Sequence, residues 1–184
     1  MRHRHPSLAK ELPRRWLMTD ERLGERLWEA LAALPKGSGV ILRHYALPRT
    51  ERRALFERIA RIARRRGLML VVAGTDRLGH APHHGRHRGT LTTPVHSRRE
   101  AIAASRGSAA LLFVSPVHPT RSHPGARPLG PARLGLLIRD LNVPVIALGG
   151  MTERRWRALR PLGVHGWAGI DAWAAGQKRI AVPT

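Results

Sequence analysis

The stretch VIALGGMTERRWRALR, from Val145 to Arg160, runs an apolar segment into two glycines and then into a basic, helix-like segment. This order is typical of a strand that turns directly into a helix. Two glycines at such a turn have two explanations. Either a tight turn needs their backbone freedom, or their bare backbone lets a phosphate approach the N–H groups. Gly149 and Gly150 are therefore candidate phosphate-binding residues.

The same order of strand and helix recurs along the chain, which predicts an α/β fold with a parallel sheet. Apolar, strand-like runs lie at residues 15–19, 39–45, 68–73, 85–89, 90–93, 109–115, 143–149 and 165–170. Apolar periodicity or capping residues predict further helices within 20–34, 50–67, 97–107 and 131–142. Eight strands favour a compact (β/α)₈ TIM barrel, with its site at the carboxyl ends of the strands. Gly79, Pro82 and Gly85 predict a shortened or irregular helix after the third strand.

Length and hydrophobic content fit one domain, since the chain has 184 residues of which 42% are hydrophobic. We expect a barrel domain over residues 13–176, a basic N-terminal tail over 1–12 and a C-terminal tail over 177–184. No apolar run approaches the roughly 20 residues that a membrane-spanning helix needs, and the N-terminus has no apolar signal core. The sequence therefore predicts a soluble, cytoplasmic protein with no membrane partner.

The charge is strongly positive: 33 Lys+Arg against 12 Asp+Glu give a formal net charge of +21. Such a chain attracts anions, and its arginines indicate either nucleic-acid affinity or a genome that favours arginine codons. The arginines are spread along the chain and only 4% of residues are aromatic, so platforms for stacking bases are scarce. Nucleic acid is therefore the less favoured partner. The absence of cysteine excludes disulfides, thiolate metal sites and cysteine nucleophiles.

A second candidate segment is LLFVSPVHPTRSHPGARPLGP, residues 111–131, in which a buried-type strand leads into a long loop. Thr120 and Ser122 alternate there with Arg121 and His123. Hydroxyl donors, a guanidinium and a histidine on a strand-end loop suit a phosphate. The alternative is a proline-rich connection whose hydroxyl groups cap turns. Two such loops at the same rim of one barrel support the phosphate interpretation more strongly than either does alone.

The segment from His96 to Trp173 resembles thiamine phosphate synthase and its relative, the thiazole tautomerase TenI. VSPVHPTRSHPGARPLG stands where that family has Gly-Pro-(aliphatic)-x-Pro-Thr-x-Thr-Lys, PVIALGGMT where it has Pro-(aliphatic)-Gly-Gly-Ile-Thr, and GVHGWAGIDAW near its end. Before His96 the similarity is looser, with GVILRHY similar to the strand carrying Gln-x-Arg-x-Lys and GRHRG similar to Gly-Val-His-Leu-Gly.

The resemblance implies a TIM barrel that joins hydroxymethylpyrimidine diphosphate to thiazole phosphate and releases pyrophosphate. It also implies Mg²⁺ as a cofactor and a phosphorylated small molecule as the partner, and it is compatible with a homo-oligomer. By position, Arg43 would hold the diphosphate. The residues that would hold the thiazole phosphate are Thr120, Ser122, Gly149, Gly150, Ile170 and Asp171.

The departures from the family pattern concentrate on the diphosphate and metal positions. The glutamine and lysine that flank the arginine fall on Ile41 and Tyr45, and the metal-binding Asn-Asp pair falls on Ala73 and Gly74. Asp76 lies close enough to be a shifted metal ligand. The second metal-binding aspartate has no counterpart, so we expect Mg²⁺ to rest mainly on the oxygens of the substrate.

The same resemblance leaves a tautomerase open, which needs a proton shuttle rather than a metal. The family lysine becomes His123, and both His118 and His123 titrate near neutrality. Arg43 and His123 are therefore the candidate catalytic residues. Two more functions stay open: a barrel that binds a phosphorylated metabolite without turnover and, least favoured, a basic nucleic-acid-binding protein.

Overall fold

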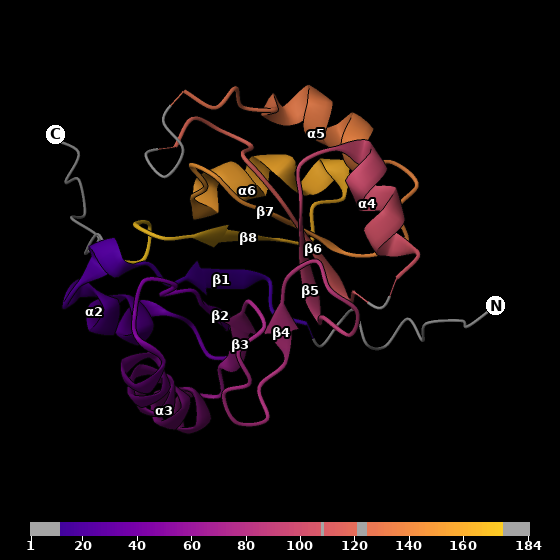
Figure 1. The fold of residues 1–184 in the computed structure, drawn as a ribbon. Coiled ribbons are helices and arrows are strands. Elements are labelled where there is room, and N and C mark those ends of the chain that lie inside the picture. Colours follow the sequence, from indigo (N-terminus) through magenta and orange to yellow (C-terminus); the bar gives the residue numbers. More distant parts are fainter. Residues whose placement is uncertain (1–11, 108, 121–124, 175–184) are drawn as a thin grey trace, which may run out of the picture.

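A closed barrel of eight parallel strands forms the centre of the protein, as a computed structural model describes it for residues 12–107, 109–120 and 125–174 (Figure 1). The strands are β1 (Arg15–Met18), β2 (Gly39–Leu42), β3 (Met69–Ala73), β4 (His83–His84), β5 (Thr92–Val95), β6 (Leu111–Val114), β7 (Val145–Ala147) and β8 (Gly166–Gly169). Each strand pairs with the next, and β8 returns to β1 with Trp167 opposite Arg15. The predicted TIM barrel is thus confirmed. Apart from Leu12, the two predicted tails lie outside the described residues.

Helices cover two sides of this barrel (Figure 1). The helices are α2 (Arg26–Ala33), α3 (Arg49–Arg66), α4 (Arg98–Ser105), α5 (Gly130–Ile138) and α6 (Glu153–Leu159), with short 3-10 turns η1 (Glu21–Leu23) and η2 (Arg160–Leu162). α2 and α3 lie beside the first strands, and α4, α5 and α6 lie beside the later ones. The expected helix over 20–34 is divided at Gly24, whose φ of 49° ends η1 before α2 begins. None of the described helices combines the length and apolar character that a membrane span requires.

The wall between β3 and β5 lacks a helix, since residues 74–82 and 85–91 are turns and irregular segments. The expectation of an irregular connection after the third strand is therefore met. The predicted fourth strand, 85–89, was wrong, because β4 lies at His83–His84 and residues 85–91 form the connection. The predicted fifth strand, 90–93, overlaps β5, which begins two residues later. Consecutive parallel strands cannot adjoin in sequence, because the chain must first travel back along the barrel.

The barrel interior is filled by aromatic side chains. Trp16 and Phe113 meet edge to face with ring centroids 5.3 Å apart, and His84 meets Phe113 at the same distance. Gly39 faces the Trp16 ring across the β1–β2 pair, and a Cβ added to Gly39 would overlap that ring. The barrel is therefore a packed core, and a ligand has room only at its ends.

Candidate functional site

A cavity of about 360 Å³ opens at the carboxyl ends of β2, β6, β7 and β8. Its walls come from the residue after β2, the loop after β6 and the turns after β7 and β8. A wider hollow of about 1380 Å³ lies beside α4, but it is lined largely by residues near the amino ends of β5, β6 and β7. Since the loops at the carboxyl ends carry the chemistry in barrels of this kind, the smaller cavity is the candidate site.

Six of the sequence-predicted site residues line this cavity together: Arg43, Thr120, Gly149, Gly150, Ile170 and Asp171. Ser122 and His123 lie outside the described residues. Asp76, the possible metal ligand, is not among the lining residues. The barrel thus gathers residues that are up to 128 positions apart in the sequence, while their roles toward a ligand stay predictions.

The glycine turn after β7 is shaped by the loop that follows β6. Gly149 and Gly150 have φ angles of 93° and 59°, a region that side-chain-bearing residues rarely adopt. A Cβ at Gly149 would come within 2.8 Å of Pro116, and one at Gly150 would overlap the carbonyl oxygen of Pro119. The backbone N–H of Val117 donates to the Leu148 carbonyl at 2.9 Å. Both glycines are therefore required by turn geometry and by this close approach, and they leave bare backbone at the cavity wall.

Helix α6 begins directly behind this turn. The Thr152 hydroxyl accepts a hydrogen bond from the Arg155 backbone N–H at 3.3 Å and so caps the helix. The Arg155 side chain donates to the Gly150 carbonyl and so ties the helix to the turn. With seven residues and a capped first turn, α6 offers little dipole for a phosphate. The glycine turn and the Thr152 cap both line the cavity.

His118 lies on the loop above this turn, and its backbone N–H donates to the Gly149 carbonyl at 3.1 Å. Burial and the nearby charge of Arg155 lower the pKa of His118, so its neutral form is favoured. The residue is not among those that line the cavity. The structure therefore gives it no direct position for proton transfer to a ligand there.

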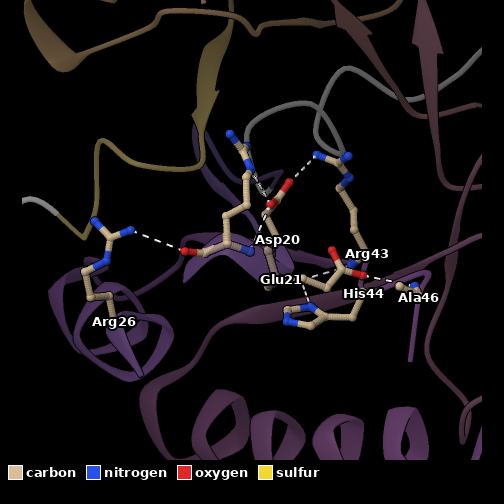
Figure 2. Close-up of polar contacts among 8 residues, drawn as sticks. Asp20, Glu21, Arg26, Arg43, His44 and Ala46 are labelled. Carbon is tan, nitrogen blue, oxygen red and sulfur yellow. Dashed lines mark hydrogen bonds and ion pairs between the residues drawn. The ribbon is translucent and has the colours of Figure 1, made fainter. Parts of the chain in front are cut away.

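On the opposite side of the cavity, Arg43 follows β2 and faces Asp20, which follows β1 (Figure 2). The Arg43 guanidinium lies 3.6 Å from the Asp20 carboxylate, and Arg22 donates to the same carboxylate at 2.6 Å. Burial alone would raise the pKa of Asp20, but the hydrogen bonds from Arg22 and the charges of both arginines lower it overall. Asp20 is thus an anion that orients Arg43 beside the cavity.

A second set of contacts holds the backbone at Arg43 to residues that follow β1. The Thr19 hydroxyl accepts the Arg43 backbone N–H at 3.0 Å and lies 2.9 Å from Nδ1 of His44. His44 is buried with a φ of 33°, and burial lowers its pKa. Figure 2 shows Glu21 beside this histidine, where its carboxylate accepts the Ala46 backbone N–H at 3.1 Å. The turn after β2 is thus held by polar contacts to the residues after β1.

Asp76 is engaged by a buried arginine on α3. Arg52 is 3% exposed, and its guanidinium donates to the Asp76 carboxylate at 2.6 Å. The same guanidinium donates to the carbonyl oxygens of Arg43 at 3.0 Å and Ala73 at 2.6 Å. It therefore joins the carboxyl ends of β2 and β3.

These contacts do not suit the Mg²⁺ that the resemblance implies. The carboxylate expected to bind the metal is paired with a guanidinium, and the described residues contain no group of three or more His, Asp or Glu that could hold a metal ion. Octahedral Mg²⁺ takes oxygen ligands, and Oδ2 of Asp76 and the carbonyl oxygens of Arg43 and Ala73 already accept hydrogen bonds from Arg52. The donor set of this structure does not fit the metal.

Another buried titratable group, His84, lies inside the barrel. Its Nδ1 lies 2.8 Å from the Thr92 hydroxyl, and burial lowers the pKa of His84 to about 4, with the charge of Arg43 acting in the same direction. The imidazole is therefore neutral at physiological pH. It packs against Phe113 and serves the core.

Sequence reasoning missed Asp20 and Arg52, although each had a signal. Asp20 directly follows the first predicted strand, at the end where barrel sites form. Arg52 lies at positions i, i+4 and i+7 with Phe56 and Ile59, and all three are buried. A charged residue within an apolar helical stripe indicates a buried polar contact, because an unpaired buried charge is costly.

Part of the chain is similar in sequence to known proteins. Residues 84–173 match the sequence model of a family described as thiamine monophosphate synthase. A putative thiamine-phosphate synthase 2 of Aquifex aeolicus is 36% identical over 77 residues, which are 42% of this chain and 41% of that protein. A thiamine-phosphate synthase of Salinispora tropica is 41% identical over 73 residues, 39% of this chain and 35% of that one. These alignments thus span about two fifths or less of the relatives' length.

Solved structures resemble the fold over most of its length. Thiamine phosphate pyrophosphorylase from Pyrococcus furiosus superposes with a TM-score of 0.76 at 23% identity, covering 92% of this chain and 91% of that one. FabK from Thermotoga maritima superposes with a TM-score of 0.65 at 15% identity, covering 95% of this chain and 64% of that one. At these identities the likeness shows the barrel fold alone. The family resemblance itself is confirmed by the sequence matches, which fall on the half of the chain that carries the glycine turn.

Proposed function

We propose that this divergent member of the thiamine monophosphate synthase family couples hydroxymethylpyrimidine diphosphate to thiazole phosphate in the cavity at the carboxyl ends of its strands. Pyrophosphate is the second product. The reaction would take place in the cytoplasm, on phosphorylated small molecules, by a protein that acts alone or as a homo-oligomer.

In this reaction the C–O bond of the pyrimidine diphosphate breaks, and its electron pair leaves with the pyrophosphate. The carbon that loses the pyrophosphate then accepts an electron pair from the thiazole, which forms the new bond. Arg43 would stabilise the charge that develops on the leaving group, because a fixed guanidinium forms strong hydrogen bonds with phosphate oxygens. Thr120 and the backbone from Gly149 to Gly150 would hold the thiazole phosphate on the other wall.

The observation that carries the proposal is the convergence of these two walls. One cavity of about 360 Å³ has a guanidinium from the end of β2 on one side and the glycine turn of β7, with the β8 turn around Ile170, on the other. A site for two phosphorylated substrates needs an anion-binding group for each, positioned so that the reacting ends meet. The family pattern assigns the same two sides to the two substrates.

The test is binding and turnover with the two substrates. We expect thiazole phosphate and pyrimidine diphosphate each to raise the melting temperature, and thiamine phosphate to appear when both are present. Arg49→Met, an exposed arginine at the start of α3, serves as the charge-matched control for Arg43→Met. No stabilisation by either ligand would count against a phosphate site, and binding without product at saturating substrates would rule out the synthase.

A second candidate, a barrel that binds a phosphorylated metabolite without turnover, is favoured by the residues that flank Arg43. Ile41 is fully buried in the core and Tyr45 is 60% exposed, so neither provides the amide or ammonium group that the family pattern has there. A binder would show thermal stabilisation by thiazole phosphate and no thiamine phosphate under any condition. The product assay therefore decides between the two candidates.

A further inference from the structure

We infer that Arg52 is a built-in cation which takes the place of a divalent metal at the carboxyl ends of β2 and β3, so that the cavity binds its phosphorylated ligands without a metal ion. The inference rests on the proposed function, since it concerns the metal that the family pattern implies for that same site.

The first step of the argument is the set of oxygens around the Arg52 guanidinium. Nη2 donates to the carbonyl oxygens of Arg43 and Ala73, and Nη1 donates to Oδ2 of Asp76. Nε also donates to the Arg43 carbonyl, at 3.2 Å. Two carbonyls and a carboxylate are the ligand types that hard divalent cations take in proteins. Here one guanidinium binds all three.

The second step is burial. The Arg52 side chain is 4% exposed, whereas the Asp76 side chain is 45% exposed. A metal that captured Asp76 would have to displace a guanidinium with almost no access to water, and a buried charge that loses its partner is strongly unfavourable. Displacement would also take the cation from two strand-end carbonyls. The Asp76 carboxylate is thus paired with a buried guanidinium, Arg52, that is also held by two backbone carbonyls.

The third step is the charge around the position. The guanidinium carbons of Arg43 and Arg52 each lie 5.9 Å from the centre of the Tyr45 ring, so two positive groups already flank one aromatic side chain. A divalent cation placed between them would be repelled by both. The other aspartates at this rim also face arginines: Asp20 binds Arg22 and Arg43, and the charge of Asp171 acts on Arg22. Guanidinium groups thus already compensate the carboxylates that a metal would need.

The consequence is that positive charge at this end of the barrel comes from arginines. Arg43 would meet the diphosphate directly, and Arg52 would hold the backbone of Arg43 in place from beneath. Arg52 is in this sense a positioning residue, since it bonds the Arg43 carbonyl and does not line the cavity.

The test begins with Mn²⁺, a paramagnetic probe for Mg²⁺ sites, titrated into the intact protein and followed by electron paramagnetic resonance. We compare the wild type with Asp76→Asn and with Asp140→Asn, an exposed aspartate after α5. The expected result is the same free Mn²⁺ signal for all three proteins. Mn²⁺ bound by the wild type and by Asp140→Asn, but lost in Asp76→Asn, would overturn the inference.

A second measurement concerns the ligand. Isothermal titration with pyrophosphate, in EDTA and in Mg²⁺, should give dissociation constants that agree within about twofold. Binding that appears only with Mg²⁺ would overturn the inference. If neither pyrophosphate nor thiazole phosphate binds, the proposed function fails. The Mn²⁺ titration still decides whether Arg52 prevents a metal ion from binding at Asp76.

The cation itself is tested by replacement. Arg52→Ala removes the guanidinium and leaves all three oxygens, so Mn²⁺ should now raise its melting temperature, whereas Arg52→Lys keeps a positive charge and should not respond. An Arg52→Ala protein that folds and ignores Mn²⁺ would contradict the role of Arg52 as the cation of this position. If that variant does not fold, the Asp76→Asn comparison remains decisive.

Discussion

The first and second halves of the barrel differ in what they bury. Among the described residues, every buried polar or charged side chain lies between Thr19 and Thr93, including Asp20, His44, Arg52 and His84. The described residues from 109 to 174 bury only apolar side chains, and they present glycine backbone to the cavity. The first half thus buries charged side chains that pair with one another, and the second half places glycine backbone at the wall of the cavity.

The sequence match to known proteins falls mostly on the second half. The match to the thiamine monophosphate synthase model begins at residue 84 and covers the half with the glycine turn. In the first half, groups that could contact a ligand or a metal are bound to each other, as Arg52 is to Asp76. One wall of the cavity therefore carries a guanidinium that is paired with a carboxylate, and the other carries glycine backbone.

The largest expected effect is on the folding of the first half. Arg52→Leu leaves the Arg43 and Ala73 carbonyls and the Asp76 carboxylate without their donor, and we expect it to lower the free energy of unfolding by about 4 kcal/mol. Arg53→Leu, an exposed neighbour on the same helix, should change it by less than about 0.5 kcal/mol. Urea denaturation measures both. Similar losses of unfolding free energy in the two variants would show that the contacts of Arg52 do not stabilise the fold more than an exposed arginine does.

The next effect is a pH dependence from His84. Its pKa is about 4 in the folded protein and about 6.5 when unfolded, so the unfolded state binds the proton more readily. Stability is then fully present above pH 6.5 and falls by roughly 3 kcal/mol as the pH drops to 4. His84→Gln should flatten this slope in urea titrations at several pH values, and the exposed His80→Gln should not. If the slope of stability against pH is unchanged in His84→Gln, groups other than His84 cause the acid sensitivity.

In the second half we expect the largest effect from the glycine turn. Gly150→Ala places a Cβ against the Pro119 carbonyl at a φ of 59°, which should displace the turn and weaken thiazole phosphate binding about 100-fold. Gly163→Ala is the matched control, because Gly163 also has a positive φ, 87°, but has open space around its Cβ position. It should cost about 1 kcal/mol of stability and leave binding intact. If Gly150→Ala still binds thiazole phosphate as the wild type does, the glycine turn is not part of the binding site.

The smallest expected effect is a difference between the two ligands in how Arg43→Met changes their binding. Arg43→Met should weaken pyrophosphate binding about tenfold and leave thiazole phosphate binding within about twofold, because the proposed function assigns the diphosphate to Arg43. Calorimetric titration of each ligand measures this, with Arg49→Met as the control. Equal losses for the two ligands would contradict the division of the cavity into separate walls.

Much of the fold was predictable from the sequence because its signals are local. Apolar runs, capping residues and the Gly149-Gly150 turn each depend on residues within a few positions. The exceptions are the fourth and fifth strands, where the two-residue β4 leaves almost no pattern to read. Six site residues follow from the family pattern and line one cavity, while Ser122 and His123 lie outside the described residues.

The sequence by itself determined the α/β alternation, the barrel and the glycine turn, because backbone preferences and side-chain periodicity act over short distances along the chain. Only the tertiary structure decided which charges meet. Asp20 reaches Arg43 and Arg52 reaches Asp76 across 23 and 24 positions, since closing the barrel brings the ends of neighbouring strands together. Electrostatic pairing depends on distances of a few ångströms in space, which no local pattern encodes.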